Sequence, residues 1–278
     1  MRFGLDVPVN GQYADPRLLA ELAADAEAAG WDGFFLQDVL QSLDPVADPW
    51  ICIAAAALRT HQVRLGVFLT PLTRRRPWQV ARQAATIDQL SAGRLLFGAA
   101  LGYSELDFTP FGETWDARIR AEQLDEALEI VAGLWSGSSY SFAGRHYRLQ
   151  DVVLRPRPRQ LPRIPIWLAA GWPRRRPVAR AARWDGVYLM TVHQETQQLL
   201  TPADVAEVVA VLAAAAPDRQ GLLDVAFNAE ISGDPAADAA SVRAFAAAGA
   251  TWWIELAPGD GSPEEYRHRI RRGPPPVA

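Results

Sequence analysis

Apolar residues follow two alternating patterns along the chain. Short, nearly continuous apolar runs are followed by longer stretches in which apolar residues recur every three or four positions. The first pattern is typical of strands buried on both faces, and the second of amphipathic helices lying on a sheet. The runs predict strands at 2–8, 32–38, 63–69, 94–101, 165–170, 185–191, 223–229 and 251–257. The periodic stretches predict helices at 16–30, 48–59, 77–91, 117–135, 174–183, 202–215, 235–248 and 263–271.

Capping and turn residues support several of these boundaries. Asp15 and Pro16 supply an N-cap and a first-turn proline to the first helix, and Gly30 closes it. Pro77 opens the third helix and Gly93 ends it. The chain is therefore divided into regular strand–helix units.

Eight such units favour one α/β architecture. Buried strands that alternate with helices form a parallel sheet, and eight repeats favour a closed (β/α)8 TIM barrel over an open doubly wound sheet. The length of 278 residues suits a single domain spanning 1–278. Residues 138–164 interrupt the repeat between the fourth and fifth units with a predicted hairpin and a segment rich in Pro and Arg. This excursion lies either on the surface or over the mouth of the barrel.

Composition limits the partners and the location. The formal net charge of −4 does not provide the basic face that nucleic-acid binding requires, so a small-molecule substrate is expected. All 28 basic residues are Arg, so a phosphate would be held by guanidinium groups, backbone N–H groups or hydroxyls. The single Cys52 excludes an intrachain disulfide, and no apolar run approaches the ~20 residues of a membrane span. We expect a cytoplasmic protein without membrane contact.

Candidate catalytic groups are sought at the carboxyl ends of the strands, where barrels of this type carry their sites. Among the titratable residues there, the candidates expected nearest the reacting group are Asp38, Tyr103, His193 and Glu230. His193 is the first choice for proton transfer because an imidazole titrates near neutral pH, and Asp38 is the second. The residues at these strand ends do not include the paired carboxylates of a glycosidase or the converging His and acid ligands of a metal site, so no metal is expected.

The loop after the fifth strand, GWPRRRPVAR at 171–180, has the composition of an anion site. Gly171 permits close backbone approach, and the helix start offers N–H groups beside Arg174, Arg175 and Arg176. A phosphate suits this loop, whereas a solvated basic turn is the alternative. A second triplet at 74–76 either points to the mouth or pairs with acids between helices.

A longer pattern resembles a known family. The stretch TPLTRRRPWQVARQAATIDQLSAGRLLFGAALG at 70–102 is similar to the third and fourth strand region of luciferase-like monooxygenases. That region runs from T-P through an Arg-x-Pro helix opening and T-L/I-D-x-L-S-x-G-R to a glycine-bearing strand. Agreement continues in AGWDGFFLQD at 29–38, FGETWDAR at 111–118, LWSG at 134–137, F-x-G-x-x-Y at 142–147 and AARWDGVY at 181–188.

The resemblance implies an oxidoreductase that acts on a small organic substrate by hydride or oxygen transfer. Its cofactor would be the deazaflavin coenzyme F420, slightly preferred, or FMN, and a homodimer is implied as well. The cofactor ring would contact the ends of strands 3 and 4, and the phosphate the start of the helix after strand 5. Carried onto this sequence, the cofactor residues are Val67, Phe68, Thr70, Ala100, Leu101, Gly102, Tyr103, Gly171, Trp172, Arg174, Arg175 and Arg176. A non-prolyl cis peptide common in the family maps nearest to Val67–Phe68.

One departure from the family pattern affects the expected chemistry. Many members of the family carry a His directly after the acid that ends strand 2, but here Val39 follows Asp38. The role of that His is vacant or has moved. A barrel that binds a flavin without turnover, or that partners an active homologue, therefore stays open. So does a phosphate-handling aldolase or isomerase, although the absence of Lys removes its Schiff-base variant.

Overall fold

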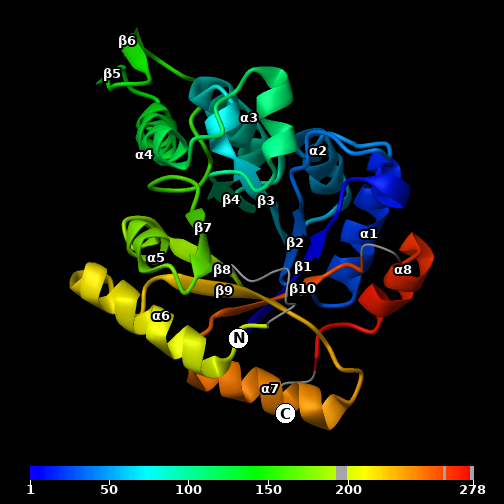
Figure 1. Cartoon of the computed structure of the whole chain (residues 1–278). Coiled ribbons are helices and arrows are strands. Elements are labelled where there is room, and N and C mark those ends of the chain that lie inside the picture. The colour runs from blue at the N-terminus through cyan, green and yellow to red at the C-terminus, as the bar shows by residue number, and fades with distance from the viewer. Residues whose placement is uncertain (192–198, 259–260, 276–278) are drawn as a thin grey trace.

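The computed structural model describes residues 1–191, 199–258 and 261–275. Within these residues, eight parallel strands close into a barrel in the order β1-β10-β9-β8-β7-β4-β3-β2, which confirms the predicted fold (Figure 1). The barrel strands are β1 Arg2–Val7, β2 Gly33–Leu36, β3 Arg64–Pro71, β4 Leu95–Ala100, β7 Ile166–Trp172, β8 Gly186–Thr191, β9 Asp224–Ala229 and β10 Trp252–Leu256.

Helices surround the barrel and are fixed at their starts by the local sequence (Figure 1). They are α1 Pro16–Ala28, α2 Pro49–Arg59, α3 Pro77–Leu90, α4 Ala117–Leu134, α5 Arg175–Ala181, α6 Pro202–Ala215, α7 Pro235–Ala247 and α8 Pro263–Arg271. Five of them begin with a capping side chain followed directly by proline. The caps are Asp15, Asp48, Thr201, Asp234 and Ser262. Each such cap contributes about 1 kcal/mol, so these helix starts are set by residues next to one another in the chain.

The hydrophobic core has two separate parts. The larger part lies between the helices and the outer faces of the strands. The smaller part fills the barrel interior and consists of Phe35, Phe68, Leu96, Trp167, Tyr188, Ala226, Trp252 and Ile254. The rings of Phe35 and Phe68 stack there with centroids 3.9 Å apart. The interior is therefore a packed aromatic layer, above which a site can be built.

The excursion at 138–164 forms an antiparallel hairpin, β5 Tyr140–Ala143 with β6 Arg148–Val152. Figure 1 shows the hairpin beyond α4, on the side away from the barrel strands. Glu126 of α4 holds its turn by accepting backbone N–H bonds from Arg145, His146 and Tyr147 at 2.7–3.0 Å. The hairpin thus packs on α4 and, through the Tyr147 ring 6.4 Å from that of Trp78, on α3, which favours the surface position of the two alternatives.

Two charged residues of the 70–102 motif have structural contacts. Asp88 accepts backbone N–H bonds from Arg159 and Gln160, and so fixes the segment that leads into β7. Arg94 donates to the side chain of Thr60 and to four backbone carbonyl groups. No helix in the described residues is long and apolar enough to cross a membrane.

Candidate active site

The carboxyl ends of the strands form the open end of the barrel interior. Because side chains alternate along a strand, the residue two positions beyond an interior residue faces the same way. At this end five such residues are partly or well exposed, in contrast to the buried aromatic layer, namely Gln37, Ala169, Met190, Asn228 and Leu256, whereas the corresponding residues of β1, β3 and β4, which are Asp6, Thr70 and Gly98, are buried. Solvent therefore reaches the interior from this side, which we call the mouth.

The end of β3 carries the predicted ring-binding residues. A non-prolyl cis peptide joins Phe68 to Leu69, one bond later than the predicted Val67–Phe68. The pairing of β3 with β4 shifts its register between Val67 and Thr70, so the backbone is irregular where the cis bond lies. Val67 and Phe68 are buried, and so is the Thr70 hydroxyl, which has no hydrogen-bond partner among the described residues.

The end of β4 is shaped by one glycine. Gly102 has a φ of +97°, and a Cβ at this position would lie 2.3 Å from the ring of Phe108. The carbonyl oxygen of Leu101 accepts hydrogen bonds from Thr73 at 2.9 Å and from Arg120 at 3.0 Å. These contacts fix the turn after Ala100, whereas Tyr103 is 77% exposed.

The loop after β7 presents the predicted phosphate residues to solvent. Arg174, Arg175 and Arg176 are all exposed. Trp172 is buried, and its indole Nε1 donates to Asp204 of α6 at 3.0 Å, which anchors the strand end. Of these three arginines, only Arg175 has an ion pair in the described part of the chain. It pairs with Glu207 at 3.4 Å, and both side chains are exposed. The guanidinium groups are therefore accessible to an anion.

Asp38 lies in an ion-pair cluster. Its carboxylate accepts hydrogen bonds from Arg74 at 2.8 Å and from Arg75 at 2.8 Å, and its side chain is 1% exposed. Arg74 also pairs with Asp107 at 2.6 Å. The first two arginines of the 74–76 triplet thus pair with acids. The catalytic role of Asp38 stays a prediction, and His193 lies outside the described residues.

A buried polar network at the mouth was missed by the sequence analysis. Asp6 of β1 accepts a hydrogen bond from the Tyr188 hydroxyl of β8 at 2.9 Å. Because β10 and β9 lie between these two strands, the bond crosses the barrel interior. The side chain of Asn228 hydrogen-bonds to the same tyrosine. The one signal in the sequence is a carboxylate within the run 3–7, whose other residues are apolar.

The environment of Asp6 changes its ionisation. Burial raises the pKa of Asp6 from 3.8 to about 7, although the Tyr188 and Gln37 side chains favour the charged form. Burial, together with the Asp6 charge, also raises the pKa of Tyr188 well above its ordinary value. The Oδ1 atom of Asp6 is buried and no donor in the described residues meets hydrogen-bond geometry with it, although the Gln37 side chain lies near enough to favour the charged carboxylate. The interior thus contains a carboxyl group that titrates near neutral pH.

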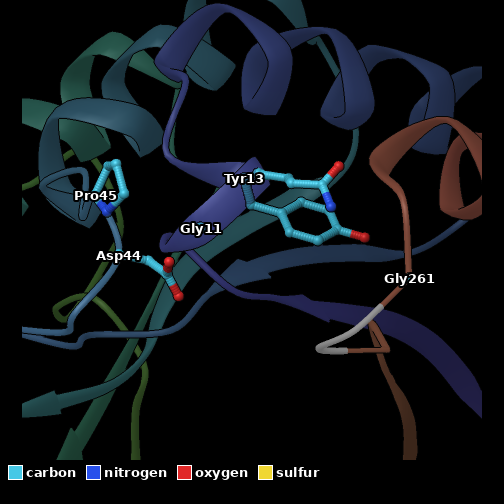
Figure 2. A pocket seen from close by; sticks show the side chains of 6 residues that line it. Gly11, Tyr13, Asp44, Pro45 and Gly261 are labelled. Carbon is cyan, nitrogen blue, oxygen red and sulfur yellow. The ribbon is translucent and has the colours of Figure 1, made fainter.

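A pocket of about 330 Å³ lies beside the mouth, where the loops after β1, β2 and β10 meet (Figure 2). Its lining consists of Gly11, Gln12, Tyr13, Asp44, Pro45 and Gly261. The described residues contain no group of three His, Cys, Asp or Glu side chains arranged to hold a metal ion. The site therefore combines a polar interior, exposed arginines and room for a small organic molecule.

The family model of luciferase-like monooxygenases matches residues 1–273. The chain belongs to the luciferase-like monooxygenase family. Two curated members that it resembles are F420-dependent glucose-6-phosphate dehydrogenases. The protein of Nakamurella multipartita is 32% identical over 62% of this chain, and that of Kineococcus radiotolerans is 36% identical over 58%. These matches cover 51% and 49% of the two relatives, so the chain spans about half the length of the curated relatives it matches.

Several solved structures share the fold. The coenzyme F420 dependent tetrahydromethanopterin reductase from Methanopyrus kandleri superposes with a TM-score of 0.79 at 16% identity, covering 98% of both chains. A monooxygenase from Streptomyces bottropensis gives a TM-score of 0.78 at 21% identity, covering 98% of this chain and 97% of its own. An F420-dependent secondary alcohol dehydrogenase in complex with an F420-acetone adduct gives 0.77 at 16% identity, covering 98% and 99%. These likenesses establish the barrel architecture.

Proposed function

We propose that this luciferase-like protein is an oxidoreductase that uses a deazaflavin, coenzyme F420, with FMN as the alternative. Family membership and the F420-dependent relatives support this assignment. The observation that carries the assignment is found at the carboxyl end of β7. There, small and partly exposed residues that face the interior are followed by three exposed arginines. Ala169 and Gly171 are the small residues, and 174–176 is the arginine triplet.

The residues at the mouth fit such a cofactor. Ala100, Ala169 and Gly171 are partly exposed and carry little side-chain bulk on the β4 and β7 side of the mouth, where the flat ring would lie. The buried Thr70 hydroxyl, unpartnered among the described residues, offers a polar atom at the end of β3. The 174–176 guanidinium groups would hold the phosphate. When bound, a deazaflavin supplies hydride transfer to or from a carbon atom of the substrate.

The substrate is proposed to be a small organic molecule that enters beside β1, β2 and β10. The pocket lined by Tyr13 and Asp44 opens there, on the polar side of the mouth that contains Gln37 and Asn228. A secondary alcohol or its carbonyl product matches this polarity and is consistent with hydride transfer. Oxygen transfer is the alternative and would require FMN.

Cofactor titration tests the proposal. Binding of F420 and of FMN would be measured by fluorescence for the wild type and for a triple Ala variant at 174–176. Loss of two charge-assisted contacts, each worth about 1.5–3 kcal/mol, raises the dissociation constant by about 10²–10⁴-fold. A matched variant replaces Arg148, Arg155 and Arg157, which are exposed on the hairpin and the segment after it, and should bind as the wild type does. Equal affinity of both triple variants would place the phosphate elsewhere.

A barrel that binds the cofactor without turnover is the second candidate. The observation that favours it is Val39, which stands where many family members have a His. In that case the wild type would bind F420 with normal affinity, but no alcohol or carbonyl substrate would change the cofactor's absorbance.

A further inference from the structure

We propose that Asp6 is the acid–base group of the reaction, exchanging a proton with the oxygen of an alcohol or carbonyl substrate at the mouth. This inference rests on the proposed function and deepens it. Asp6 is carried by β1, on the opposite side of the interior from the β4 and β7 residues assigned to the cofactor. A substrate between the two sides would meet the carboxyl group on one face and the cofactor on the other.

The unsatisfied atoms of the network point to a ligand. Buried polar atoms are nearly always hydrogen-bonded, so an exception requires an explanation. Two acceptors of this network have no partner among the described residues, Oδ1 of Asp6 and Oδ1 of Asn228, and Asp6 is only 4% exposed. A substrate hydroxyl can donate to such a carboxylate oxygen, and a carbonyl oxygen can accept from the protonated acid.

Asp6 differs from the other acids around it because it has no cationic partner in the described structure. Asp38 is bound by Arg74 and Arg75, and Glu255 of the neighbouring β10 pairs with Arg269 at 2.6 Å. The titratable groups that interact with Asp6 are the phenols Tyr188 of β8 and Tyr266 of α8. With its pKa raised to about 7 by burial, Asp6 can both take and give a proton near neutral pH, as an efficient acid–base catalyst must.

The step balances as an alcohol oxidation. The carbinol C–H bond breaks and its electron pair leaves with the hydrogen, as hydride, to the oxidised deazaflavin. The O–H bond breaks and its proton passes to the Asp6 carboxylate, while the carbon–oxygen double bond forms. The alcohol loses two electrons and the cofactor gains them. Tyr188 donates a hydrogen bond to the other carboxylate oxygen and so orients the group. The reverse reduction starts from protonated Asp6.

The test combines titration, binding and turnover. Carboxyl ¹³C NMR, with Asp6→Asn used to assign the signal, should give a midpoint near the raised value that shifts when F420 binds. With F420 and 2-propanol or glucose 6-phosphate as probes, Asp6→Asn should lower turnover by about 10²–10⁴-fold while the F420 dissociation constant changes less than about twofold. Tyr188→Phe removes a contact that favours the carboxylate, so its NMR midpoint and the inflection of its pH–rate profile should rise together. This second variant applies even if Asp6→Asn does not fold.

Several results would overturn the proposal. The proton role is refuted if the Asp6 carboxyl group titrates in the ordinary range of an aspartate. It is also refuted if F420 binding leaves the midpoint of that titration unchanged. Wild-type turnover in Asp6→Asn likewise refutes it. If His193→Ala abolishes the pH inflection and Asp6→Asn retains it, the role belongs to His193. A wild type that binds F420 but fails these tests refutes only the assignment of Asp6, whereas a wild type that binds neither F420 nor FMN refutes the proposed function and the inference with it.

Discussion

Replacement of Asp6 by Asn should make the free energy of unfolding less sensitive to pH. Asn has nearly the same shape and retains an oxygen that accepts from Tyr188, but it cannot ionise. In the wild type, the buried carboxyl group must ionise as the pH rises through neutrality. The variant should therefore gain stability relative to the wild type toward alkaline pH.

The magnitude follows from the shifted pKa. Burial raises the pKa of Asp6 in the folded state to about 7, from an ordinary value of 3.8 that holds in the unfolded chain. The folded state thus binds the proton more tightly, and the stability from this group is complete below about pH 3.8 and lost as the pH rises to about 7. At about 1.4 kcal/mol per pH unit, the full loss is about 4 kcal/mol. About 2–3 kcal/mol of it falls between pH 5 and pH 8.5.

Urea denaturation at several pH values between about 5 and 8.5 measures this difference, with constant m-values confirming that each variant unfolds in the same way. Any fixed effect of the amide group is the same at every pH, so only the slope is diagnostic. Asp218→Asn, at an exposed position, is the matched control and should follow the wild type. A stability difference between Asp6→Asn and the wild type that stays constant within about 0.5 kcal/mol over this range would refute the raised pKa.

Three further predictions concern other parts of the chain. Gly102→Ala should destabilise the fold by about 1–3 kcal/mol and weaken F420 binding, because its Cβ would clash with Phe108. Gly112→Ala is the control, because Gly112 also has a positive φ but no described atom lies within 4 Å of the added Cβ. In thermal melts this control should show only the cost of placing Ala at a positive φ. Arg94→Met should cost at least about 3 kcal/mol in urea denaturation, since it leaves buried carbonyl groups without donors, and a near-neutral effect would contradict this. Ile51 and Leu58 are 64% and 69% exposed on one face of α2 and should lie in a homodimer interface. Asp at both positions should therefore convert a dimer to a monomer, as measured by light scattering. An unchanged mass would place the interface elsewhere.

Local sequence was sufficient for most of the fold. Helix starts such as Asp15–Pro16 and Thr201–Pro202 depend on a capping side chain and a proline next to it in the chain. Strand and helix periodicities are likewise local, so all eight units were predicted to within a few residues. The 70–102 motif indicated the family, and two of its residues, Asp88 and Arg94, hydrogen-bond to backbone groups of other segments.

The chemistry of the mouth was decided by tertiary structure. Asp6 and Tyr188 are 182 residues apart, and their hydrogen bond exists only because the closed barrel places β1 and β8 across one interior. In the same way, Asp38 stands in the sequence as an acid at a strand end, and only folding brings Arg74 and Arg75 onto its carboxylate. Burial and charge pairing are properties of segments distant in the chain. Which carboxyl group is neutralised by arginines and which is left to titrate therefore depends on how the barrel closes.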